Sequence, residues 1–293
     1  MGPFDDLSDF VRPSVPLAPL TWFRLGGPAE YLARPRTTEH LATVLARCLQ
    51  SGIPFRILGS GTNVLVRDEG VRGLVVHLES PAFSDVRIEG TSVQAGAAVP
   101  VTALISQTAR AGLAGLELLT GIPGTVGGAL RGNAGGREGS IGRYVQSVEV
   151  LDDAGRVVVR EKDEIHFGPH ESDLDEPVIL GCSLSLEPDH PEAVVRRMRR
   201  IWIVKKENQP YGHQSSGYIF RDPAPDVSAR TLIDQAGLKG LRLGGAEVSD
   251  RHSGYMIAHP GATAADVLGL MELVRQRVKD HSGYDLEPQI QVW

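Results

Sequence analysis

The sequence predicts an α+β protein, in which helices and mostly antiparallel strands are mixed without regular alternation. Two long amphipathic helical patterns lie far apart, one between Thr37 and Gly52 and one after Thr263. Between them, short runs of β-branched residues are separated by glycine-containing turns, which indicates a sheet-rich middle. Strands that alternated with helices along the chain would instead predict a parallel sheet.

The N-terminal third is expected to contain two helices and three strands. Thr37 or Thr38 caps the first helix, and Gly52 ends it. Its apolar positions fall on one face: Leu41, Val44, Leu45, Cys48 and Leu49. The expected strands are 54–58, 63–67 and 73–78, with a turn at 59–62, and the second helix is 99–112.

The rest of the chain begins with a predicted β-hairpin at 145–161, whose turn is Asp153–Gly155. Strands at 178–187, 218–220 and 286–292 and helices at 191–206 and 229–237 follow from the same patterns. Thr263 caps a long helix with one apolar face, made of Val267, Leu270, Met271, Val274 and Val278. The composition changes between 188 and 210, which places a domain boundary there. The family resemblance described below implies a further division, so the expected parts are 1–80, 81–190 and 200–293.

Composition and charge exclude several classes of protein. The net charge of −6 argues against a nucleic-acid surface. No apolar run reaches the ~20 residues that a membrane span requires, and no secretory signal precedes the fold. Cys48 and Cys182 are expected to be buried hydrophobes rather than a disulfide or metal ligands, which fits a reducing cytoplasm. The basic run at 195–206 is either a solvated helix face or a site for an anion.

Two glycine-rich segments suggest a binding site made of main chain. LGSGTN (58–63) fails as a dinucleotide fingerprint, because Val64 takes the third glycine position and no helix follows. A glycine–serine–glycine turn can still direct successive N–H groups at a phosphate, and an ordinary tight turn is the alternative. LTGIPGTVGGALRGNAGG (119–136) is a second bare segment, with Thr125 as a hydroxyl donor and Asn133 just beyond. An extended ligand with a pyrophosphate would use both segments.

Several motifs then carry a family resemblance: WFRLGGPAEYL (22–32), LGSGTNVLVRDEGVRGLVV (58–76), GLAGLELLTGIPGTVGGALRGNAG (112–135), AGLKGLRLGGAEVSDRH (236–252) and the ending LEPQIQVW. The chain resembles the shorter type of the UDP-N-acetylenolpyruvoylglucosamine reductase (MurB) family. The resemblance implies a two-subdomain FAD-binding domain, like that of vanillyl-alcohol oxidase, followed by a smaller α+β substrate-binding domain. It also implies FAD as cofactor, NADPH as a candidate electron donor and a small-molecule substrate.

The resemblance places the FAD contacts largely on main chain in the two glycine-rich segments. This explains the missing side chains, because backbone donors then lie directly against the cofactor. The residues implied are Gly59, Ser60, Gly61, Thr62, Asn63, Leu65, Gly121, Thr125, Gly127 and Gly128.

The chain departs from the family at three catalytic positions that the resemblance implies. His170 in FGPHES takes the place of the arginine in F-G-Y-R-x-S. Tyr218 in GYIFRDP takes the place of the serine in G-S-x-F-K-N-P. Gln289 in LEPQI takes the place of the glutamate in L-x-x-E-V, while Glu287 lies two residues earlier.

Each replacement has a chemical and a neutral interpretation. The Tyr218 hydroxyl can act as an acid or base if its pKa, normally about 10, is lowered; otherwise its ring packs on the flavin edge. His170 carries a positive charge only when protonated, and it can equally be a solvent-facing loop residue. Gln289 can hydrogen-bond but cannot deliver an acidic proton, or its replacement is silent.

Three functions stay open at this point. The first is an FAD-dependent flavoenzyme acting on a non-standard small molecule, in a specialised biosynthetic pathway, with Tyr218 transferring the proton. The second is an authentic enolpyruvyl-UDP-sugar reductase. It would lack the family's arginine and carboxylic acid, and their loss would cost several kcal/mol of transition-state stabilisation, about as much as the loss of two oxyanion-hole donors. The third is a protein that binds FAD without redox turnover.

Overall fold

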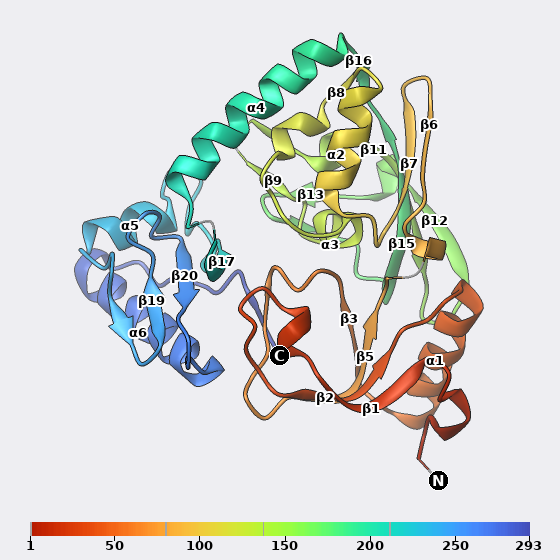
Figure 1. Ribbon diagram of the computed structural model, residues 1–293, viewed down its shortest axis with the longest axis horizontal. Helices are drawn as coiled ribbons and strands as arrows, with labels where there is room; N and C mark the ends of the chain where they lie inside the picture. Colours follow the sequence, from red (N-terminus) through yellow and green to blue (C-terminus); the bar gives the residue numbers. More distant parts are fainter. Residues whose placement is uncertain (1, 80, 137, 211) are drawn as a thin grey trace. The chain divides into compact units, whose positions relative to one another are not determined.

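The computed structural model describes residues 2–79, 81–136, 138–210 and 212–293, and it has the predicted α+β architecture (Figure 1). The chain forms two compact units. Unit 1 contains the chain from the N-terminus to Pro13, Tyr31–Ser60 and Gly73–Val204. Unit 2 contains Ser14–Glu30, Gly61–Arg72 and Lys205–Trp293. The three-part division at 80 and 190–200 stays a prediction.

Unit 1 is built on a five-stranded antiparallel sheet in the order β12-β11-β15-β7-β6. Its strands are β6 (Val86–Glu89), β7 (Ser92–Gly96), β11 (Val145–Leu151), β12 (Val157–Glu161) and β15 (Val178–Ser185). The β11–β12 pair is the predicted hairpin, closed where the Asp152 N–H donates to the Arg156 carbonyl at 2.9 Å. The helices α2 (Val101–Arg110) and α3 (Val126–Arg131) belong to the same part of the chain.

A second sheet has the order β1-β2-β5-β3, in which β3 and β5 are parallel. Its strands are β1 (Val11–Pro16), β2 (Pro28–Ala33), β3 (Phe55–Leu58) and β5 (Val71–His77). α1 (Thr38–Ser51) precedes β3 and has the predicted caps: Thr37 accepts from the His40 N–H, and Gly52 is left-handed. Leu49 departs from the predicted apolar face, because it is 49% exposed at the end of the helix.

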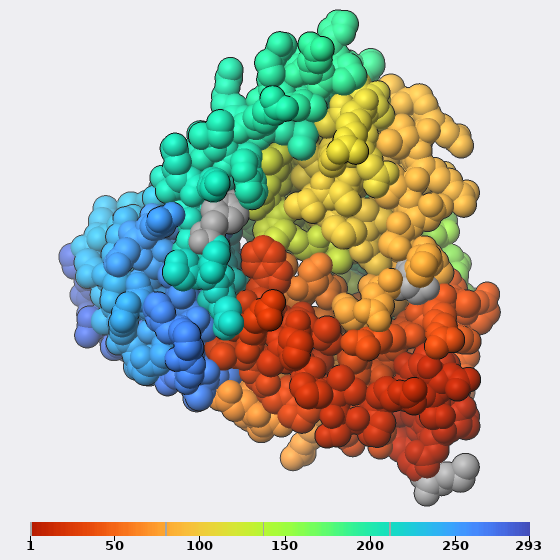
Figure 2. Space-filling model, viewed as in Figure 1, coloured from red at the N-terminus to blue at the C-terminus, as the bar shows by residue number. Residues whose placement is uncertain are grey.

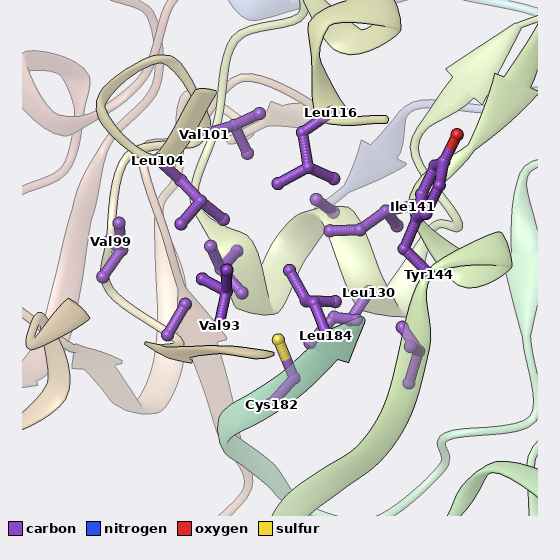
Figure 3. Close-up of a cluster of buried hydrophobic side chains, with 14 of the residues drawn as sticks. Val93, Val99, Val101, Leu104, Leu116, Leu130, Ile141, Tyr144, Cys182 and Leu184 are labelled. Atoms are coloured by element: carbon purple, nitrogen blue, oxygen red, sulfur yellow. The ribbon is translucent and has the colours of Figure 1, made fainter. Parts of the chain in front are cut away.

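Unit 1 has two hydrophobic cores. One lies between α1 and the β3–β5 pair and includes Leu41, Leu45 and Val76. The other lies between the large sheet and α2 and α3, and Figure 3 shows Leu104, Leu130 and Leu184 converging there. Cys182 belongs to this second core and Cys48 to the first, both as free thiols. Both are buried, as predicted, and burial raises the pKa of Cys182 to about 12 and that of Cys48 to about 11, which lowers their reactivity.

Unit 2 combines a four-stranded sheet with two helices. The sheet has the order β17-β20-β19-β18, with strands Gln214–Gly217, Tyr255–Ala258, Ala246–Val248 and Arg242–Leu243, respectively. The helices are α5 (Ala229–Gln235) and α6 (Ala264–Ser282), and the predicted apolar face of α6 is buried in one core. Thr263 and Asp266 form a capping box at the start of α6, which confirms the predicted cap.

The segment 61–72 belongs to unit 2 through contacts far along the chain. β4 (Val64–Leu65) pairs in parallel with β21 (Gln291–Val292). The Asp68 carboxylate accepts from the N–H groups of Ala264 and Ala265, both at 2.9 Å. A carboxylate at the start of a helix satisfies free N–H groups and the helix dipole, so this contact ties the segment to α6.

The basic run forms most of α4 (Pro191–Asn208), in which Val194 is the one buried residue (Figures 1 and 2). Arg197 pairs with Glu117 and Asp189, both at 2.8 Å, while Arg196, Arg199 and Arg200 are exposed. This exposure fits the predicted solvated helix face, and the anion site stays a prediction.

The remaining elements are short. The strands are β8 (Leu113–Ala114), β9 (Gly135–Gly136), β10 (Gly139–Ser140), β13 (Phe167–Gly168), β14 (Glu171–Ser172) and β16 (Glu187–Pro188). The 3₁₀ helices are Asp5–Leu7, Ala18–Leu20, Pro81–Phe83, Leu116–Leu119, Ile141–Arg143 and Lys162–Glu164. Among the described residues, no helix combines the length and apolarity needed to cross a bilayer.

Candidate functional site

The two predicted FAD segments meet at Gly59 and Thr125, both in unit 1. Gly59 follows β3, and Thr125 is the residue before α3. A Cβ placed on Gly59 would lie 2.6 Å from the Thr125 Oγ1, which is closer than a real Cβ contact allows. Thr125 is itself buried. A side chain at position 59 would therefore force the buried Thr125 hydroxyl to move.

The glycines of α3 differ in the room around them. A Cβ on Gly127 would lie 3.0 Å from the Ala97 Cβ, so a side chain there would crowd the chain before α2. Around Gly128 the nearest atom within the protein is the Thr125 Oγ1, at 3.7 Å from an added Cβ. Alanine would fit there and would favour the helix by about 1 kcal/mol. The protein alone does not require glycine at 128.

The 59–62 turn presents unused main-chain donors. Among the described residues, none accepts a hydrogen bond from the N–H groups of Gly59, Ser60, Gly61 or Thr62. Gly61 has φ +62°, and a Cβ on it would lie 2.2 Å from the Leu20 carbonyl oxygen. Consecutive N–H groups around a left-handed residue form the concavity that binds anions in other proteins.

The next predicted FAD residues are integrated into unit 2. The Thr62 carbonyl accepts from the buried Ser216 hydroxyl at 2.9 Å. The Asn63 side-chain amide donates to the Gln289 carbonyl at 3.2 Å, and its own carbonyl accepts from the Gln291 N–H at 3.0 Å. Leu65 is fully buried in the core of unit 2. The structure therefore brings Thr62 and Asn63 together with Gln289.

Tyr218 belongs to the same neighbourhood of unit 2. It follows the last residue of β17 and has φ +56°, which is uncommon for a residue with a side chain. The next residue, Ile219, accepts through its carbonyl from the Gln289 N–H at 2.8 Å. The predicted strand at 218–220 is thus wrong: the strand ends at Gly217, because the left-handed backbone of Tyr218 interrupts the extended conformation.

Two aromatic rings lie beside Tyr218 and form a cluster with it. Its ring centre is 6.3 Å from those of His252 and Tyr255, and the latter two rings are 5.0 Å apart. Tyr255 lies over the main chain at Gly217, where a Cβ would come within 2.3 Å of its ring. Ser216 and Tyr255 are not among the predicted site residues. Ser216 directly precedes the GYIF motif, which could have pointed to it, whereas Tyr255 meets Gly217 only through strand pairing.

Burial sets the protonation states in this cluster. Desolvation raises the pKa of Tyr218, and the negative charge of Asp222 adds to the rise, although the residue is 53% exposed. The lowered pKa that would make Tyr218 a base is therefore not found. Burial, and then the positive charge of Arg230, lowers the pKa of His252 to about 4. At neutral pH Tyr218 is a protonated donor and His252 is uncharged.

His170, the third predicted catalytic residue, lies in unit 1. It occupies the two-residue turn between β13 and β14, is partly exposed and has φ +58°. Asn133 donates to the Gly168 carbonyl of this hairpin, and Arg131 donates to the carbonyl groups of Leu174 and Glu176, just after it. Arg131 was not selected from the sequence, and a lone charge within a glycine-rich stretch is the signal that was available. The described residues contain no cluster with the composition of a metal site.

The chain matches two family models. Residues 209–293 match the C-terminal domain of UDP-N-acetylenolpyruvoylglucosamine reductase, and residues 29–160 match an FAD binding domain. A protein of Moorella thermoacetica with the name UDP-N-acetylenolpyruvoylglucosamine reductase is 42% identical over 284 residues, covering 97% of this chain and 93% of the relative. One of Rhodopirellula baltica with the same name is 35% identical, covering 99% and 94%.

Solved structures agree with the sequence relatives. The crystal structure of UDP-N-acetylenolpyruvylglucosamine reductase (MurB) from Thermus caldophilus has a TM-score of 0.84 at 37% identity, covering 97% of this chain and 100% of that chain. A cholesterol oxidase from B. sterolicum has a TM-score of 0.50 at 15% identity, covering 64% of this chain and 39% of that one. The second likeness concerns the fold alone.

Proposed function

Because the chain belongs to the UDP-N-acetylenolpyruvoylglucosamine reductase family, we propose that it reduces an enolpyruvyl ether of a UDP-amino sugar with electrons from NADPH. It is an FAD-dependent oxidoreductase of that family. The observation that carries the proposal is 42% identity across 97% of this chain and 93% of a relative named for that reaction. Identity that covers both chains almost completely favours a shared reaction.

The residues present fit FAD. The free N–H groups of the 59–62 turn can hydrogen-bond a pyrophosphate, and the space at Gly128 leaves room for a ligand against main chain. We assign the FAD contacts to Gly59, Ser60, Gly61, Thr62, Gly121, Thr125, Gly127 and Gly128, as the resemblance implies. Asn63 and Leu65 support this segment from within unit 2, because their described contacts are to its C-terminal strand and core.

When bound, FAD supplies a hydride acceptor for NADPH and a hydride donor for the substrate alkene. The neighbouring carbon then needs a proton from the protein. We assign this proton to the Tyr218 hydroxyl because the residue occupies the implied catalytic position and is protonated at neutral pH, although its raised pKa makes it a weaker acid than an ordinary phenol. Gln289 would orient the substrate by hydrogen bonds, and His170, when protonated, would stabilise developing negative charge.

A second candidate function is catalysis on another small molecule. The observation that favours it is the exchange of all three implied catalytic positions, to His170, Tyr218 and Gln289. A permanently charged arginine and a carboxylic acid have both been lost, and each replacement changes the charge or proton that the site can supply. A protein that binds FAD without redox turnover has no observation in its favour.

Anaerobic flavin reduction separates the two enzymes. We expect NADPH to bleach the flavin absorbance and enolpyruvyl-UDP-N-acetylglucosamine to restore it. Bleaching without restoration would overturn the proposed substrate and favour the second candidate. Tyr218→Phe should slow restoration by about 10- to 100-fold while leaving bleaching unchanged. Tyr284→Phe, at another exposed tyrosine of unit 2, is the matched control and should change neither rate.

A further inference from the structure

The His170 turn is a strained element that its surroundings must hold in place. β13 and β14 pair with Phe167 opposite Ser172 and Gly168 opposite Glu171, which leaves only Pro169 and His170 in the turn. Proline followed by a positive φ is the pattern of a type II turn, whose third position favours glycine or asparagine. A histidine there disfavours the turn, so contacts from outside the hairpin must stabilise it.

Asn133 makes the contact nearest to that turn. Its Nδ2 donates to the carbonyl of Gly168, the residue just before Pro169, at 2.7 Å. Its Oδ1 accepts from the Gly142 N–H at 3.1 Å, so both ends of the amide are used. Asn133 is buried, with 6% exposure, and its own φ is +38°. A buried carbonyl that loses its donor is destabilised, so the Gly168 carbonyl depends on this amide.

Arg131 attaches the other end of the same loop. Its guanidinium donates to the carbonyl of Leu174 and, at 2.6 Å, to that of Glu176. The Ser172 hydroxyl donates in turn to the Arg131 carbonyl at 3.0 Å. All these contacts leave from the C-terminal end of α3, a six-residue helix whose N-terminal end carries Thr125, Gly127 and Gly128. One rigid element therefore connects the proposed FAD segment of unit 1 to the His170 turn.

We propose that Asn133 is a positioning residue, which fixes the Pro169–His170 turn on α3 and thereby the place of His170 relative to the Thr125–Gly128 segment. The inference rests on the proposed function, in which His170 faces the reacting molecule. Asn133 acts through the Gly168 carbonyl and does not itself contact substrate. Without this hydrogen bond the turn would be free to move. A displacement of about 1 Å at a reacting group can lower the rate of an enzyme about 100-fold.

Asn133→Asp tests this with the smallest change. The carboxylate keeps an acceptor for the Gly142 N–H and tolerates a left-handed backbone, but it places an oxygen against the Gly168 carbonyl instead of a donor. Asn208→Asp, on the exposed face of α4, adds the same charge away from the hairpin and is the control. Amide hydrogen exchange should accelerate at least about 10-fold in 165–174 in the first variant and not in the second. Unchanged exchange would overturn the proposal.

A double-mutant cycle with His170→Ala distinguishes positioning from general destabilisation. Asn133→Asp should lower kcat/KM by about 10- to 100-fold when His170 is present, and by less than about 3-fold when it is alanine. Equal factors in both backgrounds, or a His170→Ala variant with wild-type rates, would overturn the inference.

The cycle is read on restoration of the flavin absorbance. If the wild-type flavin is bleached but never restored by the enolpyruvyl sugar, the proposed substrate is wrong. The hydrogen-exchange comparison of Asn133→Asp with Asn208→Asp needs no substrate, and it then still decides whether Asn133 holds the turn. The two failures are thereby distinguishable.

Discussion

The 59–62 turn and the Tyr218 cluster differ in the kind of group that each offers to a ligand. At the turn the functional groups are main-chain N–H groups, and the chain there is confined by backbone atoms such as the Leu20 carbonyl. Around Tyr218 the surroundings are side-chain rings, and burial sets their protonation states. A main-chain site can change only by changing backbone conformation, whereas a side-chain site can change by single substitutions. This difference would account for glycine motifs that resemble the family beside implied catalytic positions that differ from its motifs.

The strongest test of the comparison is Gly61→Ala. With φ +62° and a Cβ 2.2 Å from the Leu20 carbonyl oxygen, alanine must displace backbone. We expect a loss of roughly 3 kcal/mol or more in the free energy of unfolding, and purification without FAD. Urea unfolding and the flavin absorbance measure the two effects.

Gly52→Ala is the matched control, because Gly52 has the same φ of +62° but no atom within 4 Å of an added Cβ. It should lower the free energy of unfolding by only about 1 kcal/mol and keep the flavin. Equal losses in both variants would mean that the confinement around the turn is unimportant.

The second test concerns the side-chain region and uses pH. The pKa of His252 is about 4 in the folded protein and about 6.5 when unfolded. Because protonation favours the unfolded state, the stability that neutral His252 contributes is present above pH 6.5 and is lost as the pH falls towards 4. The expected loss is about 3 kcal/mol.

In the structure the Gly254 N–H donates to the His252 Nδ1 at 3.2 Å. His252→Asn keeps an acceptor for this N–H group and removes the titrating ring. Urea unfolding of both proteins at pH 7 and pH 4 isolates the contribution of His252, since the other titrating groups cancel. A wild-type protein that loses no more stability than the variant would contradict the burial argument.

Gly128→Ala tests whether glycine at position 128 is required by bound FAD or by the packing of the protein itself. The methyl group fits, with the nearest atom at 3.7 Å, and alanine favours the helix. We therefore expect the FAD-free protein to gain about 1 kcal/mol, while FAD binds about 10-fold more weakly because the methyl group occupies its space. Thermal unfolding without FAD and a flavin titration give the two values.

Gly132→Ala is the control at the end of the same helix, where an added Cβ would make an ordinary contact at 3.5 Å. It should leave FAD affinity unchanged. An undiminished affinity in Gly128→Ala would remove this residue from the proposed cofactor site.

The smallest expected effect is that of His170→Gly. A positive φ costs a residue with a side chain roughly 1 kcal/mol, and glycine removes that cost. Glycine also has more conformational freedom in the unfolded chain, which offsets part of the gain in stability. Urea unfolding should show a gain of about 0.5 kcal/mol together with a loss of activity. His166→Gly, on the same hairpin but without a positive φ, should destabilise; a gain there too would disprove the strain argument.

Local patterns in the sequence determined the helices with strong end signals and the tight hairpin. The Thr37 and Thr263 caps and the turn between β11 and β12 lie where the sequence predicted them, because capping and turn formation depend on residues within one or two turns of each other. The motifs also indicated the family and its cofactor. The sequence alone therefore determined the fold class and the flavin chemistry.

Tertiary contacts decided the rest. VGGALR forms α3 despite two glycines, because the segment before α2 accepts hydrogen bonds from the Val126 and Gly127 N–H groups, both at 2.9 Å. The strand β17 ends before Tyr218 because Tyr218 has a left-handed backbone, next to Gly217, whose main chain lies against the Tyr255 ring. Segment 61–72 joins unit 2 through partners near residues 264 and 291. These outcomes depend on atoms nearly 30 to more than 200 positions away, and a local pattern contains no information about them.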